Sequence, residues 1–323
     1  MHQQARVLVP LQIGGAPPPW EQATHALQGA TMGTTWSARF AAPALLRLNI
    51  IEAAITRVLD EVIAEMSHWE PDSALSRFNR AASGSLHALP AGFATVMDAA
   101  LEIAQASSGA FDPTVCELVR QWGFGPPGTA EAARCDWRQL AWDGRQLTQG
   151  GTARLDLSAI AKGHAVDRAA QALLDFGIEH HLVEIGGELR GGGCKPDGQP
   201  WWVDLEPPDA DACEIEPLRI ALHGLAIATS GDYRRFRIDE HGRRRSHTLD
   251  PRTGEPIAHG LASVSVVHES AMWADGWSTA LMVLGREDGL QLAHERRLAA
   301  RFVQREQNGF SEHFSPALAE LLQ

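Results

Sequence analysis

The sequence predicts an α+β protein in which mixed or antiparallel sheets pack against helices, with one βαβ-type unit. Segments with a helical apolar period alternate along the chain with segments that have the two-residue period of strands. Asp143-Gly144 is a hairpin signal, and residues 154–185 have a strand–helix–strand pattern. A hydrophobic content of 44% in 323 residues is sufficient for a sizeable core.

The beginning of the chain differs from the rest. Residues 1–28 are predicted to be an N-terminal extension, because glycine and proline recur over residues 14–19. We expect residues 29–323 to form one domain, whose first strand lies within Gln28–Phe40. The start has neither a long apolar run nor a lipid-bearing cysteine, so we expect a cytoplasmic protein, or a periplasmic one if the start is truncated.

Amphipathic helices are predicted where apolar residues recur at helical spacing. The first covers Leu46–Ser67, and Asp72 or Ser73 is expected to cap a short helix after it. Further helices are expected over residues 90–107, 272–284 and 287–298. Strands are expected over residues 201–205, 218–222, 225–229, 234–238, 243–249 and 261–267. The strands 218–222 and 225–229 are expected to pair, and 234–238 is expected to form a hairpin with 243–249.

The βαβ-type unit occupies the centre of the chain. Arg154–Leu157 alternates like a strand, Ser158 is expected to cap the following helix, and strand His181–Ile185 ends at a Gly-Gly turn. Helix starts and glycine turns present backbone N–H groups that can bind anions. Lys162 in the first helical turn opposes the helix dipole, which favours contact with a phosphate; an ordinary solvated lysine is the alternative.

Composition and cysteine spacing exclude several classes of protein. A net charge of −12 argues against nucleic-acid binding, which needs a basic surface. The four cysteines form no Cys-x-x-Cys pair, so they do not indicate a zinc site. No run of about 18 apolar residues is present, so no transmembrane segment is expected.

Nine short segments resemble, in order, those of the FAD:protein FMN transferases of the ApbE type. They include Met32-Gly33-Thr34-Thr35, Ser67-His68-Trp69-Glu70-Pro71-Asp72-Ser73, Gly109-Ala110-Phe111-Asp112-Pro113-Thr114, Leu155-Asp156-Leu157-Ser158, Ile185-Gly186-Gly187-Glu188, His247-Thr248-Leu249-Asp250-Pro251 and Ala274-Asp275-Gly276-Trp277. The resemblance covers roughly residues 30–285. It implies an ApbE-like fold and a magnesium-dependent enzyme that cleaves FAD, releases AMP and attaches FMN by a phosphoester bond to a threonine. That threonine belongs to a target flavoprotein, such as a subunit of a redox-driven ion pump or a reductase.

A magnesium site is the first part of the predicted centre. Asp275 and Thr279 lie four residues apart, so both face one side of a helix and can offer oxygen ligands to a hard cation. A capping or back-bonding pair would explain the same spacing. The resemblance implies that both residues bind Mg²⁺ together with the backbone carbonyl of Ala161.

Flavin contacts are implied by the same resemblance. The matching residues are Met32, Trp69, Ala110, Phe111, Asp112, Ser158, His164 and Leu249. Trp69 can stack on a flat ring, although core packing would also explain it. His164 stands where the family often has tyrosine, and Glu188 where aspartate is usual.

His247 is the candidate catalytic base for the acceptor hydroxyl. It can equally be a residue that only orients its loop, because phosphoryl transfer depends mainly on positioning and charge neutralisation. Two other functions use the same residues. One is a magnesium-dependent FAD pyrophosphatase with water as nucleophile, and the other is a non-catalytic FAD-binding protein.

Overall fold

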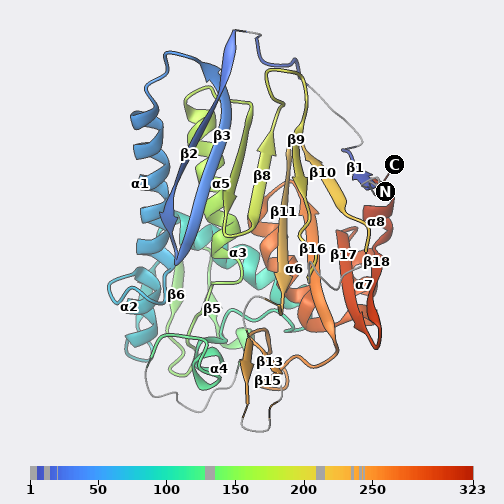
Figure 1. Cartoon of the computed structure of the whole chain (residues 1–323). Helices are drawn as coiled ribbons and strands as arrows, with labels where there is room; N and C mark the ends of the chain where they lie inside the picture. The colour runs from blue at the N-terminus through green and yellow to red at the C-terminus, as the bar shows by residue number, and fades with distance from the viewer. Residues whose placement is uncertain are drawn as a thin grey trace.

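The structure is a computed structural model that describes residues 6–10, 15–19, 21–127, 135–208, 215–233, 236–239, 242 and 244–322. Its main element is an eight-stranded sheet (Figure 1). The strands are β2 (Gln22–Thr31), β3 (Thr34–Pro43), β7 (His181–Ile185), β8 (Glu188–Gly192), β11 (Leu225–Gly231), β16 (Leu261–His268), β17 (Ala299–Glu306) and β18 (Gly309–Phe314). Their order is β18-β17-β16-β11-β8-β7-β3-β2, and every neighbouring pair is antiparallel.

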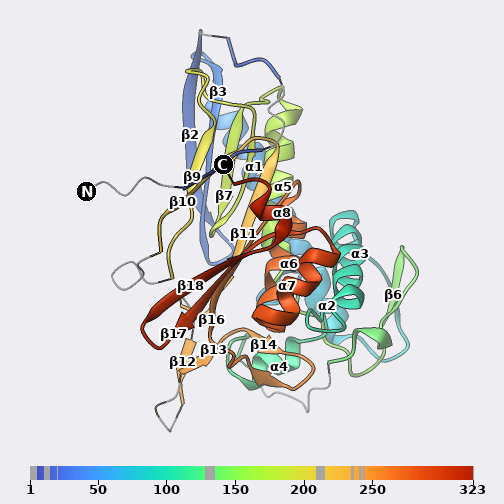
Figure 2. The same cartoon turned by 90° about the vertical axis from the view of Figure 1, so that its right-hand side faces the viewer.

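Helices lie on one side of this sheet (Figure 2). They are α1 (Leu48–Met66), α2 (Ala74–Arg80), α3 (Ala91–Ala106), α4 (Cys116–Gln121), α5 (Ala161–Asp175), α6 (Ala271–Leu284) and α7 (Arg286–Glu295). The main core lies between sheet and helices and contains Phe40, Phe93 and Phe302. Ile51, Ile55, Leu59 and Val62 form a buried stripe of α1, so the apolar period predicted that helix correctly.

A second, smaller core lies against the opposite face of the sheet. It is formed with β1 (Arg6–Leu8), β9 (Trp201–Asp204), β10 (Leu218–Leu222) and α8 (Pro316–Ala319). Strand alternation explains the two cores, because Ala226 and Ala228 of β11 face the main core while Ile227 between them faces the second. Strand β1 pairs with β10, and β2 begins at Gln22. The boundary expected at residue 28 therefore falls inside a strand.

Short ladders complete the fold. Strands β4 (Leu86–Ala88), β6 (Gln146–Thr148) and β5 (Ala141–Trp142) form one sheet, β12 (Phe236–Ile238) pairs with β13 (Arg244–Ser246), and β14 (Leu249–Asp250) pairs with β15 (Glu255–Pro256). The β5–β6 turn and the β12–β13 hairpin are both confirmed, although residues 234, 235 and 243 of the predicted hairpin lie outside the described residues. Ser73 caps α2, as predicted, by accepting a hydrogen bond from the backbone of Ser76.

The α+β class and its antiparallel sheets are confirmed, but the βαβ-type unit is wrong. Arg154 forms only an isolated bridge to Val115, and the segment through Leu157 is irregular. The Asn79 side chain accepts from the Leu155 N–H at 2.7 Å and donates to the Leu155 carbonyl at 2.8 Å. The Asn79 side chain thus satisfies Leu155, and the backbone groups of Arg154 and Asp156 bond to Cys116 and Pro113, so the segment joins no sheet. Helix α5 then leads into β7, whose partners are antiparallel.

Two further expectations are corrected. The strands 218–222 and 225–229 do not pair: β10 lies beside β9 and β1, whereas β11 lies between β8 and β16. Leu218, Ile220 and Leu222 of β10 lie in the second core, whereas β11 contributes residues to both cores, and alternation alone does not show this difference. Ser158 is not the cap of α5, because the helix begins after Ile160 without a side-chain cap and Ser158 instead donates to Asp156. Among the described residues, no helix is long and apolar enough to cross a membrane.

Candidate active site

A cavity of about 1040 Å³ opens between the sheet and the helix starts. It is lined by the β2–β3 turn, the loops after α1 and α3, the start of α5 with the segment before it, the β7–β8 turn, β9, β11, α6 and the segment after β13. Most predicted site residues share it: Met32, Trp69, Ala110, Phe111, Asp112, Ser158, Ala161, His247, Leu249, Asp275 and Thr279. Segments far apart in the sequence are therefore brought together at one place.

Two tight turns form part of the cavity wall. Met32 has a φ of 47° and Gly33 a φ of 70°, so the turn that links β2 to β3 has the left-handed backbone of a type I′ hairpin. Gly186 and Gly187 have φ values of 63° and 108° between β7 and β8. These glycines confirm the glycine turn that the sequence predicts where His181–Ile185 ends, and they let the chain reverse at the cavity edge.

The close contact of α5 with α6 positions the candidate metal ligands. A Cβ atom at Gly163 would lie 2.6 Å from the backbone carbon of Ala271 and 2.8 Å from Cβ of Asp275, so only glycine fits. The Gly163 N–H donates a hydrogen bond of 3.0 Å to Oδ2 of Asp275. One turn further along α6, Oγ1 of Thr279 lies 3.0 Å from Oγ of Ser230 on β11. This packing holds Asp275 and Thr279 beside the start of α5.

A second connection fixes the start of α6. The Asp167 carboxylate on α5 accepts hydrogen bonds from Oγ of Ser270 at 2.6 Å and from the N–H groups of Ala271 and Met272 at 3.0 Å. It also pairs with Arg190 of β8 at 2.5 Å. An acidic side chain of one helix thus caps the positive end of the next, so α5, α6 and β8 keep a fixed relation.

Carboxylates dominate the charge of the cavity. Lys162 forms an ion pair with Glu188, and both side chains line the cavity. Burial raises the pKa of Glu188 and of Asp275, while the Lys162 ammonium opposes both shifts. Oε2 of Glu188 is buried and has no hydrogen-bond partner among the described residues. Such an acceptor-rich site suits a cation.

The donor set fits magnesium rather than zinc. No group of three or more His, Cys, Asp or Glu residues forms a metal site in the described part of the chain. A carboxylate, a hydroxyl and a backbone carbonyl are hard oxygen ligands, and Mg²⁺ commonly uses one or two carboxylates together with substrate phosphates. Asp275, Thr279 and Ala161 all line the cavity and supply such a set.

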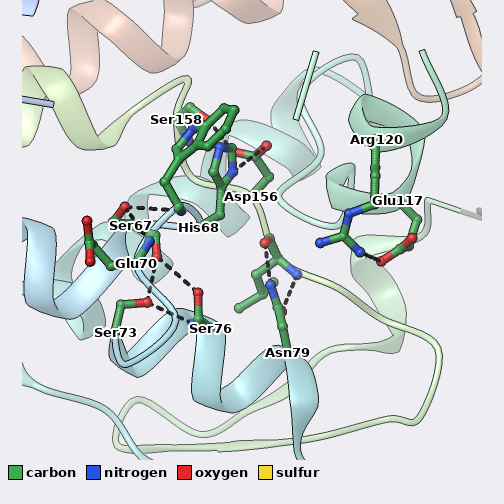
Figure 3. Close-up of polar contacts among 12 residues, drawn as sticks. Ser67, His68, Glu70, Ser73, Ser76, Asn79, Glu117, Arg120, Asp156 and Ser158 are labelled. Atoms are coloured by element: carbon green, nitrogen blue, oxygen red, sulfur yellow. Dashed lines mark hydrogen bonds and ion pairs between the residues drawn. The ribbon is translucent and has the colours of Figure 1, made fainter. Parts of the chain in front are cut away.

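A buried histidine–carboxylate pair forms another part of the wall (Figure 3). Nδ1 of His68 lies 2.9 Å from Oδ2 of Asp156, and the Ser158 N–H donates to Oδ1 of Asp156 at 2.9 Å. The hydroxyl of Ser158 donates to the same oxygen. Burial works against the charged form of both groups, yet their mutual attraction prevails. The pKa of His68 is raised and that of Asp156 is lowered.

Two predicted flavin contacts have contrasting surroundings. The Trp69 side chain is 58% exposed, so it is not a core residue and its ring is accessible at the cavity. Asp112 is buried and orders its own loop, since Oδ1 accepts from Thr114 and Oδ2 accepts from the N–H of Trp137 at 3.1 Å. Burial raises the Asp112 pKa, and these hydrogen bonds oppose that shift.

His164 is the predicted flavin contact that does not line the cavity. Its Nε2 is buried without a hydrogen-bond partner among the described residues, near Gly92 at the start of α3 and the Glu65 carboxylate of α1. Burial lowers its pKa to about 4. Gly163 faces α6, so the next residue of the helix is directed toward α1 and α3 instead. The expected contact of His164 with FAD finds no support in this arrangement.

Comparison with known proteins identifies the family of the chain. The pattern of the ApbE family matches residues 32–302. The chain belongs to the ApbE family. It is similar to the FAD:protein FMN transferase of Vibrio cholerae serotype O1, with 37% identity over 97% of this chain and 96% of that protein. It is also 33% identical to the FAD:protein FMN transferase of Escherichia coli K12, over 96% of this chain and 94% of that protein.

Solved ApbE structures share the fold. The apo form of the Pseudomonas stutzeri flavinyl transferase ApbE superimposes with a TM-score of 0.84 at 36% identity, over 93% of this chain and 97% of that one. The flavin transferase ApbE from Vibrio cholerae gives the same TM-score and identity, over 93% of this chain and 99% of that one. The antiparallel sheet with its helix layer is therefore the ApbE architecture.

The sequence predicted no role for two residues of the cavity wall, His68 and Asp156. His68 belongs to a segment that matches the family, and Asp156 stands at a polar position of the supposed strand. The position of His68 directly before Trp69, a predicted flavin contact, was the signal in the sequence that could have identified it. Nothing local connects it to Asp156, because the pair forms only when the loop after α1 packs against the start of α5.

Proposed function

We propose that this chain is an FAD:protein FMN transferase. The observation that carries the proposal is the shared cavity: the candidate flavin contacts Met32, Trp69 and Phe111 and the oxygen ligands Asp275 and Thr279 line one space. The named ApbE relatives support the same activity. Side chains that can contact a flavin ring and side chains that can bind a cation line the same cavity. This combination suits a dinucleotide whose diphosphate is the reacting group.

Charge supports a divalent cation in this reaction. Eight acidic residues line the cavity against one lysine, so the cavity by itself would repel a diphosphate. Bound magnesium would neutralise diphosphate oxygens and the charge that develops on the leaving group. We infer that Asp275, Thr279 and the Ala161 carbonyl hold it. Lys162, kept in place by Glu188, contributes a second positive charge at the same location.

We propose the following transfer step. The acceptor threonine oxygen forms a bond to the phosphorus of the FMN half, the bond from that phosphorus to the bridging oxygen breaks, and AMP leaves. We propose that the His247 imidazole takes the proton of the threonine hydroxyl. The centroid of the His247 ring lies 6.3 Å from the centroid of the Phe124 ring, and the two rings meet edge to face at the cavity wall. The acceptor belongs to a target flavoprotein, such as a subunit of a redox-driven ion pump or a reductase.

One experiment separates this activity from its alternatives. The protein is incubated with FAD and magnesium, with and without a flavoprotein that carries an acceptor threonine, and FMN adducts and AMP are measured by mass spectrometry. Transfer predicts a threonine–FMN adduct and AMP formation that depends on the acceptor. Equal AMP formation without acceptor would establish a pyrophosphatase, and FAD binding without AMP would establish a binding protein.

A further inference from the structure

His68 is held between the cavity and a buried carboxylate. It lies in the loop after α1, and its side chain, 9% exposed, lines the cavity. Nδ1 lies 2.9 Å from Oδ2 of Asp156, which comes from the segment that precedes α5 (Figure 3). Nδ1 of the ring is therefore held by Asp156, while the His68 side chain also lines the cavity.

The hydrogen bonds of Asp156 determine which nitrogen carries a proton. Oδ1 accepts from both the N–H and the hydroxyl of Ser158, so the carboxylate acts only as an acceptor. Nδ1 of His68 must then be the donor in its contact with Oδ2. No hydrogen bond to Nε2 of His68 is found within the described ranges. Nε2 is thus the ring nitrogen available to a ligand in the cavity.

The surrounding charges favour the protonated ring. Asp156 faces His68 from the start of α5, and Glu70 belongs to the same loop. Arg120 of α4 opposes protonation, but its guanidinium is paired with Glu117 at 2.8 Å. Burial lowers the pKa of His68 and Asp156 raises it by more, so the net direction is upward. A protonated His68 would add a second positive side chain to a cavity that has Lys162 and eight acidic residues.

We propose that His68 is a further FAD-binding residue, which donates a hydrogen bond from Nε2 to an acceptor oxygen of FAD. The inference rests on the proposed function. The centroid of the Trp69 ring lies 5.5 Å from that of His68, so a flat ring stacked on Trp69 would have its edge near the imidazole. A carbonyl oxygen of the flavin ring and an oxygen of the diphosphate are the two acceptors of this chemistry.

The test is a titration with FAD in the presence of magnesium from pH 5.5 to 8.5. We compare wild type with His68→Asn, whose amide can still donate to Asp156 but which lacks the outer nitrogen. His68→Gln provides a neutral donor near the position of Nε2. His87→Asn is the matched control, because His87 contacts Ser85 at 2.8 Å and does not line the cavity. Thermal unfolding of each variant shows whether it is folded.

A hydrogen bond from a charged donor corresponds to a change in affinity of about ten-fold or more. We expect His68→Asn to bind FAD about ten-fold more weakly than wild type at pH 6, with a difference that shrinks as the pH rises. His68→Gln should recover part of the affinity without this pH dependence, and His87→Asn should match wild type. Equal affinities and equal pH profiles for wild type and folded His68→Asn would overturn the inference.

Riboflavin and ADP distinguish the two acceptors. A loss of riboflavin affinity in His68→Asn would assign Nε2 to a flavin carbonyl, whereas a loss of ADP affinity would assign it to the diphosphate. A loss for neither compound would contradict the proposed hydrogen bond. If wild type binds no FAD at all, the proposed function fails, and this outcome differs visibly from normal FAD binding that is insensitive to His68.

Discussion

Replacement of Gly163 by alanine tests the contact between α5 and α6 directly. The added methyl group would lie 2.6 Å from the backbone carbon of Ala271 and 2.8 Å from Cβ of Asp275. Ordinary carbon–carbon contacts need about 3.5 Å or more. The obstacle is backbone and not a flexible side chain, so the helices must separate, and the hydrogen bond of 3.0 Å from Gly163 to Asp275 lengthens.

The expected cost combines three effects. Overpacking of a filled interior costs about 1–3 kcal/mol, and weakening a hydrogen bond to a carboxylate adds about 1.5 kcal/mol. Alanine regains about 1 kcal/mol through its higher helix propensity. We therefore expect Gly163→Ala to lower the free energy of unfolding by about 1.5–3.5 kcal/mol. FMN transfer should fall further than the loss of folded protein explains, because Asp275 moves away from Ala161.

Denaturant unfolding monitored by circular dichroism measures the first effect, and the transfer assay on folded protein measures the second. Gly92→Ala is the matched control in α3, since its methyl group would meet the ends of the Glu65 and His164 side chains, which can move. It should change stability by less than about 1 kcal/mol. Neutral substitutions change the free energy of unfolding by up to about 0.5 kcal/mol. If the value for Gly163→Ala lies within about 0.5 kcal/mol of wild type and the variant retains full transfer, the close helix contact is not what positions the site.

Three further predictions concern charged groups. Asp275→Ala should abolish FMN transfer, and chelation should do the same reversibly on wild type; Thr279→Ala should be milder, because water replaces a neutral ligand more easily. Full transfer by Asp275→Ala with chelator present would refute the metal role. His247→Ala should lower the transfer rate while FAD affinity stays nearly constant, and an unchanged rate would assign His247 to structure. The stability difference between wild type and Asp156→Asn should be largest between about pH 4 and 6.5. The His68 contribution is lost above its ordinary pKa of 6.5, as the pH rises through the raised folded value, and the Asp156 contribution is lost below 3.8, through its lowered folded value. A pH-independent difference in urea unfolding would contradict this pairing.

The sequence predicts those parts of the fold that depend on local chemistry. The apolar period of α1, the Ser73 cap and the glycine turn after β7 involve residues close together in the chain, so their patterns are readable. The alternation of polar and apolar residues does not predict which strand pairs with which. The Arg154–Leu157 segment alternates because Leu155 is buried and Asp156 binds His68, not because a neighbouring strand forms a ladder with it.

The sequence places the candidate site residues in short motifs, but it does not show how their side chains are oriented. Asp275 and Thr279 share one helix face whatever their surroundings, so the spacing already implied their proximity. The orientation of the His164 side chain is not predictable from the sequence, because it depends on which side of α5 meets α6. Gly163 determines which side of α5 meets α6 through a contact between the two helices, and local sequence patterns do not predict such a contact. The His68–Asp156 pair depends in the same way on how α1 and its loop pack against α5.

The proposed function requires an acidic protein to bind an anionic substrate, and the residues proposed for this task gather around the start of α5. Ser158 and Asp156 before the helix fix His68, Ala161 and Lys162 in its first turn face the cavity, and Gly163 brings Asp275 against it. With a net charge of −12, the long-range field repels a diphosphate, so attraction has to come from groups within a few ångströms. In the proposed site, this one short segment lies beside the candidate cation ligands, Lys162 and His68 together. Displacement of this segment should impair the binding of both metal and flavin, whereas loss of one side chain should impair only its own contact.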